Sequence, residues 1–295
     1  MLKVFLVLLT FLPSYALADM TEWADFQVID GLLVFDIELY GKPAKALIDS
    51  GSQINMISVK AVEENRTEVQ RGKKITTSGV IGSEKSDIYK NVPVTLFGIK
   101  TKLVKVSTIE KEYADIFLGL PFLRSFIIQI DYPNSKIRLL TKESIDLELY
   151  ENIAMKTHQG TNFPLVEVSL NDENNVWLVL DLAYTGSIFL DRAIAKRKGW
   201  LKKFSLSKTE LHGAIEQLES ESFWLPEIQF GPIELENIKV TIPPEGENIH
   251  LFEIDTSLTH INGVLGYEVL KHFVLTIDFK IGKMHIGYSN RVGKN

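Results

Sequence analysis

An internal repeat is the feature that most constrains the fold of this chain. The segment from Phe117 to Lys136 is matched by the segment from Val264 to Lys283, which lies 147 residues later. The identical pairs include Gly119 and Gly266, Leu123 and Leu270, Phe126 and Phe273, Asp131 and Asp278, and Lys136 and Lys283. Several identities at one constant spacing indicate a duplicated structural unit. The 295-residue chain is long enough for two such units of ordinary domain size.

Each half also contains an apolar strand that ends at an aspartate. In the first half, three apolar residues lead into Asp49, which Ser50 and Gly51 follow. In the second half, the run from Val176 to Leu180 leads into Asp181, 132 residues after Asp49. A loop of this kind presents a carboxylate, and a glycine in it lets a second segment approach closely. The smaller spacing of this pair predicts that the second half has a longer middle, near residues 201–221 or 243–259.

The local patterns predict β-hairpins and only short helices. Alternating and apolar runs bounded by polar turns are typical of strands. We expect strands at 32–39, 44–48, 92–97, 101–107, 127–131, 136–140, 165–170 and 176–180, and short helices at 58–65, 121–125, 191–198 and 267–272. Asp131 and Asp278 end strands before turns, so we expect them to form turns and not to take part in catalysis.

The first of these loops resembles a known family. The sequence Asp49-Ser50-Gly51-Ser52, followed by an apolar run that ends at Gly119 and a short helix, resembles the retropepsin-like and pepsin-like aspartic peptidases. The resemblance implies an all-β fold with two tandem retropepsin-like barrel lobes (the acid-protease fold), a few short helices and a cleft between the lobes. The lobes would be residues 19–150 and 151–295.

The resemblance also implies the site and the chemistry. Asp49 and Asp181 would face one another over a water molecule and share a proton, so that the pair activates the water for attack on a peptide bond. Ser50, Gly51 and Ser52 would support the first catalytic loop. The flap candidates are Gly79 and Val80 in the first half and Gly213 in the second, and Gly119 and Gly266 would be structural loop glycines. No metal or organic cofactor is implied, and the substrate is a peptide or protein bound in an extended conformation.

The second catalytic loop departs from the family pattern and leaves alternatives open. Asp181 is followed by Leu182, which has no hydroxyl, and by Ala183 in place of glycine. The preferred hypothesis is an aspartic endopeptidase in which Asp49 and Asp181 of one monomeric chain form the pair. One alternative is a catalytically impaired peptide-binding or scaffolding protein of the same fold. Another is a homodimeric peptidase that uses Asp49 from each chain.

Composition argues against other classes of function. The formal net charge is −6, which does not favour binding to nucleic acid. The chain has no cysteine, so disulfides and thiolate metal sites are excluded. The six histidines show no spacing typical of metal ligands.

Residues 1–18 have the features of a signal peptide. Lys3 is followed by an apolar run from Val4 to Leu12, and Ala16-Leu17-Ala18 forms a small-x-small cleavage pattern. We therefore expect an exported protein, periplasmic or secreted, whose mature chain begins at Asp19. No later run is long and apolar enough to predict a membrane span after removal of the signal.

Overall fold

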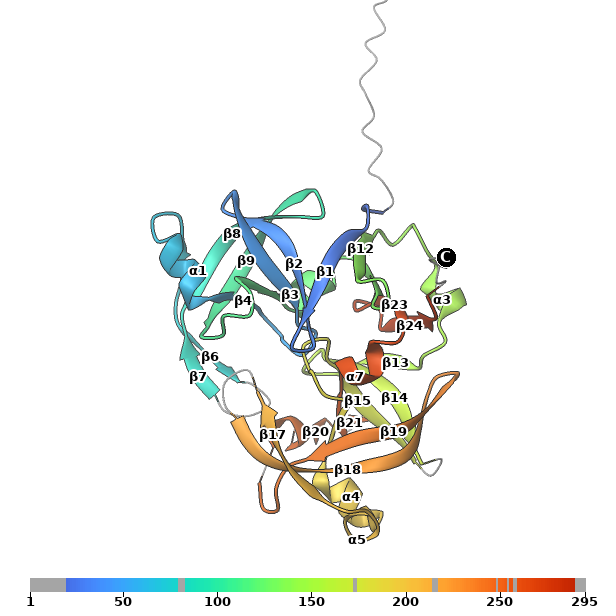
Figure 1. Cartoon of the computed structure of the whole chain (residues 1–295). Helices are drawn as coiled ribbons and strands as arrows, with labels where there is room; N and C mark the ends of the chain where they lie inside the picture. The colour runs from blue at the N-terminus through green and yellow to red at the C-terminus, as the bar shows by residue number, and fades with distance from the viewer. Residues whose placement is uncertain are drawn as a thin grey trace, which may run out of the picture.

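The first half of the chain folds into a closed barrel of six strands. The computed structural model describes residues 20–78, 83–171, 174–213, 217–247, 249–253, 255–256 and 259–289 (Figure 1). In the barrel, neighbouring strands follow the order β2-β3-β10-β4-β9-β8, and pairing of β2 with β8 closes it. These strands are β2 (Leu32–Leu39), β3 (Lys42–Ile48), β10 (Ile116–Leu118), β4 (Asn55–Ser58), β9 (Ile99–Ile109) and β8 (Ile88–Leu96).

The second half forms an equivalent barrel. Its strand order is β14-β15-β22-β16-β19-β18, and β14 pairs with β18 to close it. The strands are β14 (Pro164–Leu170), β15 (Asn174–Leu180), β22 (Gly263–Leu265), β16 (Ile188–Leu190), β19 (Ile233–Ile242) and β18 (Gln217–Phe230). The prediction of two tandem β-barrel lobes is therefore confirmed.

A sheet between the barrels joins the two halves, and it contains the repeated segments. Its order is β24-β23-β11-β12-β1, with β1 continuing into β2 of the first barrel (Figure 1). Gln129 of β11 pairs with Thr276 of β23, and its Nε2 donates to the threonine Oγ1 at 3.0 Å. The two residues are 147 apart, so the repeat places them on a local two-fold axis. The strands are β1 (Ala24–Ile29), β11 (Ile127–Asp131), β12 (Lys136–Leu140), β23 (Val274–Asp278) and β24 (Lys283–Gly287).

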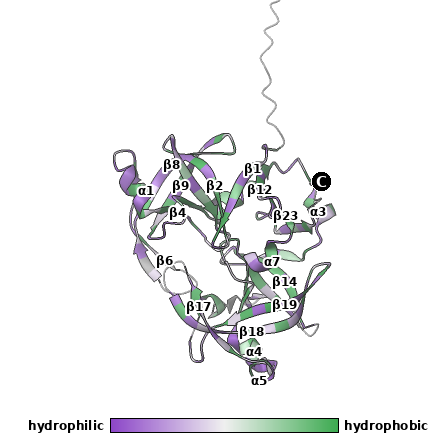
Figure 2. Cartoon of the chain, viewed as in Figure 1, coloured by the Kyte–Doolittle hydropathy of each residue, from purple (hydrophilic) through white to green (hydrophobic). Residues whose placement is uncertain are grey.

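Two-residue turns set the register of the first barrel. Tyr40 and Gly41 both have positive φ, at 53° and 75°, and they connect β2 to β3. Phe97 and Gly98 have φ of 52° and 76° between β8 and β9. Two consecutive positive φ values are typical of type I′ turns, whose twist matches that of an antiparallel hairpin. Hydrophobic and hydrophilic residues are interleaved along the barrel strands (Figure 2), so that one face of each strand enters the core.

The helices are short, and each of the four predicted helices is present within a few residues of its expected bounds. They are α1 (Val59–Glu64), α2 (Leu120–Leu123), α3 (Leu147–Tyr150), α4 (Arg192–Arg197), α5 (Trp200–Lys203), α6 (His250–Glu253) and α7 (Tyr267–Leu270). Ser58 caps α1 by accepting from the Ala61 N–H, and Asp191 caps α4 by accepting from Ala193. None of the helices in the described ranges is long and apolar enough to cross a membrane.

The remaining strands include two hairpins that reach toward the space between the barrels. β6 and β7 extend from the first barrel in the direction of β17, which lies in the second (Figure 1). The bounds are β5 (Gln70–Arg71), β6 (Ile75–Ser78), β7 (Ser83–Ser86), β13 (Met155–Thr157), β17 (Ser207–His212), β20 (Asp255–Thr256) and β21 (Thr259–His260). The spacing predicts that the middle of the second half is longer than that of the first, near residues 201–221 or 243–259. The segments from α5 to β17 and from α6 to β21 lie in or beside these regions.

Asp131 and Asp278 form turns, as predicted. The Asp131 carboxylate accepts hydrogen bonds from the backbone and side-chain amides of Asn134. The Asp278 carboxylate accepts from the backbone N–H groups of Lys280 and Ile281.

Candidate active site

The two aspartate loops leave their barrels in the same way. β3 ends at Ile48 and β15 ends at Leu180, so that Asp49 and Asp181 are the first residues after a strand. The Asp49 N–H donates to the Leu118 carbonyl at 3.0 Å, and the Asp181 N–H donates to the Leu265 carbonyl at the same distance. Each loop is thus held by the strand that precedes the repeated glycine. The duplication builds two matching supports for two carboxylates.

Gly119 and Gly266 allow the backbone to pass close beneath each loop. A Cβ at Gly119 would lie 2.5 Å from the Ile54 carbonyl oxygen, and a Cβ at Gly266 would overlap the Tyr184 carbonyl oxygen. The Gly119 N–H also donates to Asn55 Oδ1 at 2.9 Å. A side chain at either position would push the loop away from its support.

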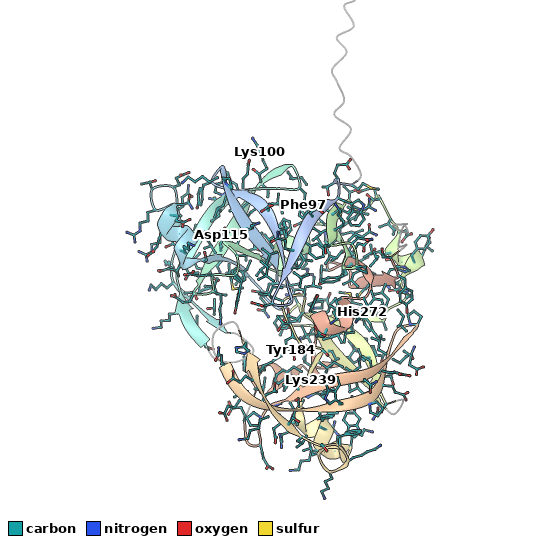
Figure 3. All side chains as sticks on the ribbon, viewed as in Figure 1. Phe97, Lys100, Asp115, Tyr184, Lys239 and His272 are labelled. Atoms are coloured by element: carbon teal, nitrogen blue, oxygen red, sulfur yellow. The ribbon has the colours of Figure 1, made fainter. Side chains whose placement is uncertain are left out.

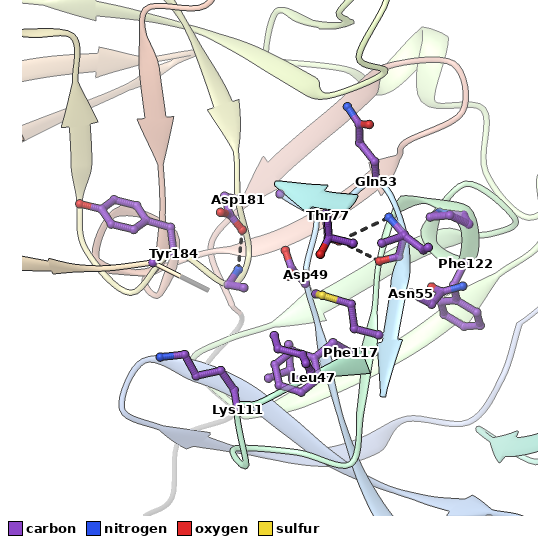
Figure 4. A pocket seen from close by; sticks show the side chains of 18 of the residues that line it. Leu47, Asp49, Gln53, Asn55, Thr77, Lys111, Phe117, Phe122, Asp181 and Tyr184 are labelled. Carbon is purple, nitrogen blue, oxygen red and sulfur yellow. Dashed lines mark hydrogen bonds between the residues drawn. The ribbon is translucent and has the colours of Figure 1, made fainter. Parts of the chain in front are cut away.

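The two loops meet, and their carboxylates enter one space. A Cβ at Gly51 would overlap the Asp181 carboxyl group, so the glycine leaves room for the aspartate of the other lobe. The Gly51 backbone N–H is hydrogen-bonded to both carboxyl groups. Figure 4 shows Asp49 and Asp181 facing the same cavity, with Thr77 of β6 also lining it. Two aspartates that are 132 residues apart in sequence therefore become neighbours.

The side chain of Ser50 makes two hydrogen bonds to the second loop and its strand. Its hydroxyl donates to the Leu180 carbonyl at 2.7 Å and accepts from the Leu182 N–H at 2.9 Å. Ser50 and Leu182 are both fully buried. The missing hydroxyl at Leu182 is replaced by an apolar side chain that packs in the core. One serine and one packed leucine therefore join the lobes at the site.

Ser52 and Ala183 stabilise their own loops. The Ser52 hydroxyl donates to the Ile54 carbonyl at 2.7 Å. The Ala183 N–H donates to Asp181 Oδ1 at 2.9 Å, so the alanine keeps the backbone donor that a glycine would supply. The methyl group of Ala183 packs beside the cluster around Leu47 and Phe117.

The surroundings make both carboxyl groups hard to ionise. Burial raises the pKa of Asp49 well above its usual range, the nearby Asp181 raises it further, and the Gly51 N–H opposes the shift. Burial also raises the pKa of Asp181, while backbone N–H groups of Ala183, Gly51 and Tyr184 oppose the shift. Asp181 receives more donors than Asp49, so the shared negative charge is better stabilised on the Asp181 side of the pair.

A cavity of about 1140 Å³ surrounds the pair and is lined by both lobes. Leu47, Met56 and Phe117 line it from the first lobe, and Phe163 and Phe189 from the second. This shape leaves room for an extended peptide across the carboxylates. It is the cleft that the resemblance predicts.

One of the flap candidates, Gly213, lies within the described residues. Gly213 follows β17 and lines the cavity. Gly79 and Val80 lie outside the described residues, but Ile75, Thr76 and Thr77 of the strand that leads to them line the cavity.

Sequence reasoning missed several residues of the site. Tyr184 occupies in the second loop the position that Ser52 has in the first, and burial raises the pKa of its phenol, which is hydrogen-bonded to Thr241. The spacing of 132 residues could have identified it. Lys111 and Phe117 also line the cavity, and no motif marks their role.

Two further observations bear on the chemistry of the site. Among the side chains that the structure describes, no group of three His, Asp or Glu residues is placed to hold a metal ion. Asp49 and Asp181 line the same cavity, and the pKa of each is raised above the usual range of a carboxyl group.

Comparison with known proteins bears on the first lobe. Residues 35–122 match the family model described as an aspartyl protease. The matched range runs from β2 to α2, so it includes the Asp49 loop, β6, β7 and Gly119. A search of curated protein sequences gives no match.

Proposed function

We infer, from the match of residues 35–122 to an aspartyl protease family model and from the meeting of the two loops, that this chain is an endopeptidase that uses Asp49 and Asp181 as its catalytic pair. The observation that carries the proposal is the meeting of the two loops, with Gly51 leaving space for the Asp181 carboxyl group. Two carboxyl groups this close cannot both ionise easily, so they share one proton. Burial raises the pKa of both carboxyl groups, and this supports a pair that holds one shared proton.

The chemistry follows from the shared proton. The charged oxygen of the pair takes a proton from a water molecule as that water attacks the peptide carbonyl. The protonated oxygen donates to the carbonyl oxygen and stabilises the charge that develops on it. The pair titrates as a unit, so the two roles belong to the pair and not to one residue.

The test is a comparison of two isosteric variants. Asp49→Asn and Asp181→Asn each keep the shape of the side chain but cannot take up the proton from water. We expect each variant to reduce kcat/KM on a peptide library by at least roughly 10³-fold, because either change breaks the shared-proton pair. Circular dichroism should show that both variants remain folded. Near wild-type turnover by Asp49→Asn would overturn the peptidase proposal.

We further propose that the chain is exported and that its mature form begins at Asp19. The support is the Ala16-Leu17-Ala18 pattern after an apolar run. N-terminal sequencing of the protein recovered from the periplasm or culture medium would test this. Recovery of Met1 or Leu2 in a membrane fraction would contradict it.

A further inference from the structure

One segment of the first lobe, residues 70–111, is strongly basic. Residues 70–111 contain nine Lys and Arg against three Asp and Glu, a net charge of +6. The whole chain has a net charge of −6, so the remainder carries −12. Two of these basic residues, Arg71 and Lys74, form ion pairs with Asp87.

Three lysines of this region line the cleft. They are Lys102 and Lys105 of β9 and Lys111 of the following loop. Apart from the aspartate pair, Asp30 is the only acidic residue among the lining residues that the structure describes, and the second lobe adds His212 and His250. The ion pairs formed among the described residues include none of these three lysines.

The arrangement of these lysines is electrostatically unfavourable when the cleft holds no anion. Lys105 lies directly opposite Lys90 in the β8–β9 pairing, and like charges at such positions destabilise a sheet. Lys111 is half-buried, so less water screens its charge than at a fully exposed lysine. A carboxylate bound in the cleft would offset the repulsion and would gain from the low screening.

An apolar floor lies beside the lysines. Leu47, Met56, Ile109 and Phe117 belong to one packed cluster and line the cavity. Figure 4 shows Lys111 on the same side of the aspartate pair as Leu47 and Phe117. An extended peptide presents every second side chain to the same side. Residues two positions before and after an apolar residue on this floor would therefore point toward the lysines.

We propose that the first-lobe half of the cleft selects peptides in which acidic side chains lie two positions before and after a large apolar residue, through Lys102, Lys105 and Lys111. The proposal rests on the peptidase function inferred above and names its substrate class. Lys100 offers a matched control. It lies on the same strand two residues before Lys102, is exposed, and does not line the cavity. Figure 3 shows it at the end of the first lobe far from Tyr184 in the cleft.

The experiment compares peptides that differ only in charge. One peptide with a central Phe is made with Glu, Gln or Lys two positions before and after the Phe, and kcat/KM is measured for each at low salt. We expect the Glu form to exceed the Gln form by roughly tenfold, and the Lys form to be the poorest, because each exposed ion pair contributes about a two- to fivefold effect. The Glu-to-Gln ratio should fall in 0.5 M NaCl as screening increases.

Lysine variants identify the source of the preference. Lys102→Gln, Lys105→Gln and Lys111→Gln should each lower the Glu-to-Gln ratio by roughly twofold, so that the three together account for the roughly tenfold preference, whereas Lys100→Gln should leave it unchanged. A wild-type ratio near one, or a ratio that changes as much with Lys100→Gln, would overturn the proposal. Lys100→Gln should also cleave the Gln peptide as wild type does, because it lies outside the cavity lining.

A binding measurement separates this proposal from the peptidase function. Fluorescence anisotropy with labelled Glu and Gln peptides on Asp49→Asn reports charge selection without turnover. If wild type cleaves none of the peptides, the peptidase proposal fails, and tighter binding of the Glu peptide still supports selection by the lysines. If the Gln peptide is cleaved and both peptides bind equally, the lysine proposal fails alone.

Discussion

At the scale of single residues, two side chains decide the properties of the site: the carboxyl group of Asp49 and the hydroxyl of Ser50. The first is costly to ionise and the second joins the lobes. Each therefore affects stability as well as catalysis, and each can be tested by one substitution.

The raised pKa of Asp49 predicts how stability depends on pH. The native state binds the Asp49 proton more tightly than the unfolded chain, whose carboxyl pKa is about 3.9. The tighter proton binding stabilises the native state fully at pH values below the unfolded-state pKa. This stabilisation is lost as the pH rises through the folded-state pKa of Asp49. Asparagine does not ionise, so Asp49→Asn does not lose stability in this way as the pH rises. We therefore expect the stability of Asp49→Asn relative to wild type to increase between pH 3 and pH 7.

Thermal unfolding of both proteins across this range measures the effect, with Asp36→Asn as a control at an exposed carboxylate. A stability difference between Asp49→Asn and wild type that does not change with pH would contradict the prediction. Activity should be highest at acidic to mildly acidic pH, because the pair needs its shared proton.

Ser50→Ala should weaken the junction of the lobes. It leaves the Leu180 carbonyl and the Leu182 N–H without their buried partner, which costs about 1–3 kcal/mol each. Tm should fall by several degrees, and kcat should fall because the carboxylates lose alignment. The matched control is Ser52→Ala, whose hydroxyl bonds only within its own loop. Equal losses of Tm in the two variants would contradict a special role for Ser50.

At the scale of elements, the β6–β7 and β17–β18 hairpins are the parts of the fold placed to close over a peptide. Residues of β6 and β17 line the cavity from opposite lobes. The strands around them are parts of closed barrels, whereas β6 and β7 form a separate two-stranded ribbon. A ribbon of this kind has few neighbours to hold it and opens more easily than barrel strands.

We therefore expect a bound peptide to slow amide exchange in β6, β7 and the end of β17. Hydrogen exchange of Asp49→Asn, with and without excess peptide, measures this without turnover. The β8–β9 turn at Phe97 and Gly98 is the internal control, because neither residue lines the cavity. Protection of that turn alone, with no change in β6 or β17, would show that the peptide binds elsewhere.

At the scale of the whole molecule, the single chain supplies both halves of the site. The five-stranded sheet between the barrels pairs β11 with β23 over five residue pairs, and Ser50 joins the loops on the cleft side. Two lobes on one chain meet at an effective concentration of roughly millimolar, far above that of separate molecules at usual protein levels. These features support a monomer as the active species.

A monomeric active species predicts a specific result when two inactive variants are mixed. Asp49→Asn and Asp181→Asn should both be inactive, and mixing them should restore nothing, since no molecule contains an intact pair. Specific activity should not fall on dilution, and sedimentation should show one copy. An active Asp181→Asn dimer would instead support pairing of Asp49 from two chains.

The repeat and the local patterns determined much of this fold by themselves. Apolar alternation and turn residues act between neighbours, so the hairpin at residues 32–48 and the strands at 127–131 and 136–140 could be predicted closely. The Asp-Ser-Gly loop identified Asp49, and the apolar run before Asp181 identified its partner. These signals lie within short stretches of sequence.

Only the tertiary structure decided whether the second loop could face the first. Leu182 lacks the expected hydroxyl, yet its N–H reaches Ser50 and its side chain fills the core. The place of Lys111 beside Phe117 in the cleft also depends on how the lobe folds. Such relations join residues that are far apart in sequence, and they arise from packing and buried hydrogen bonds that no local pattern records.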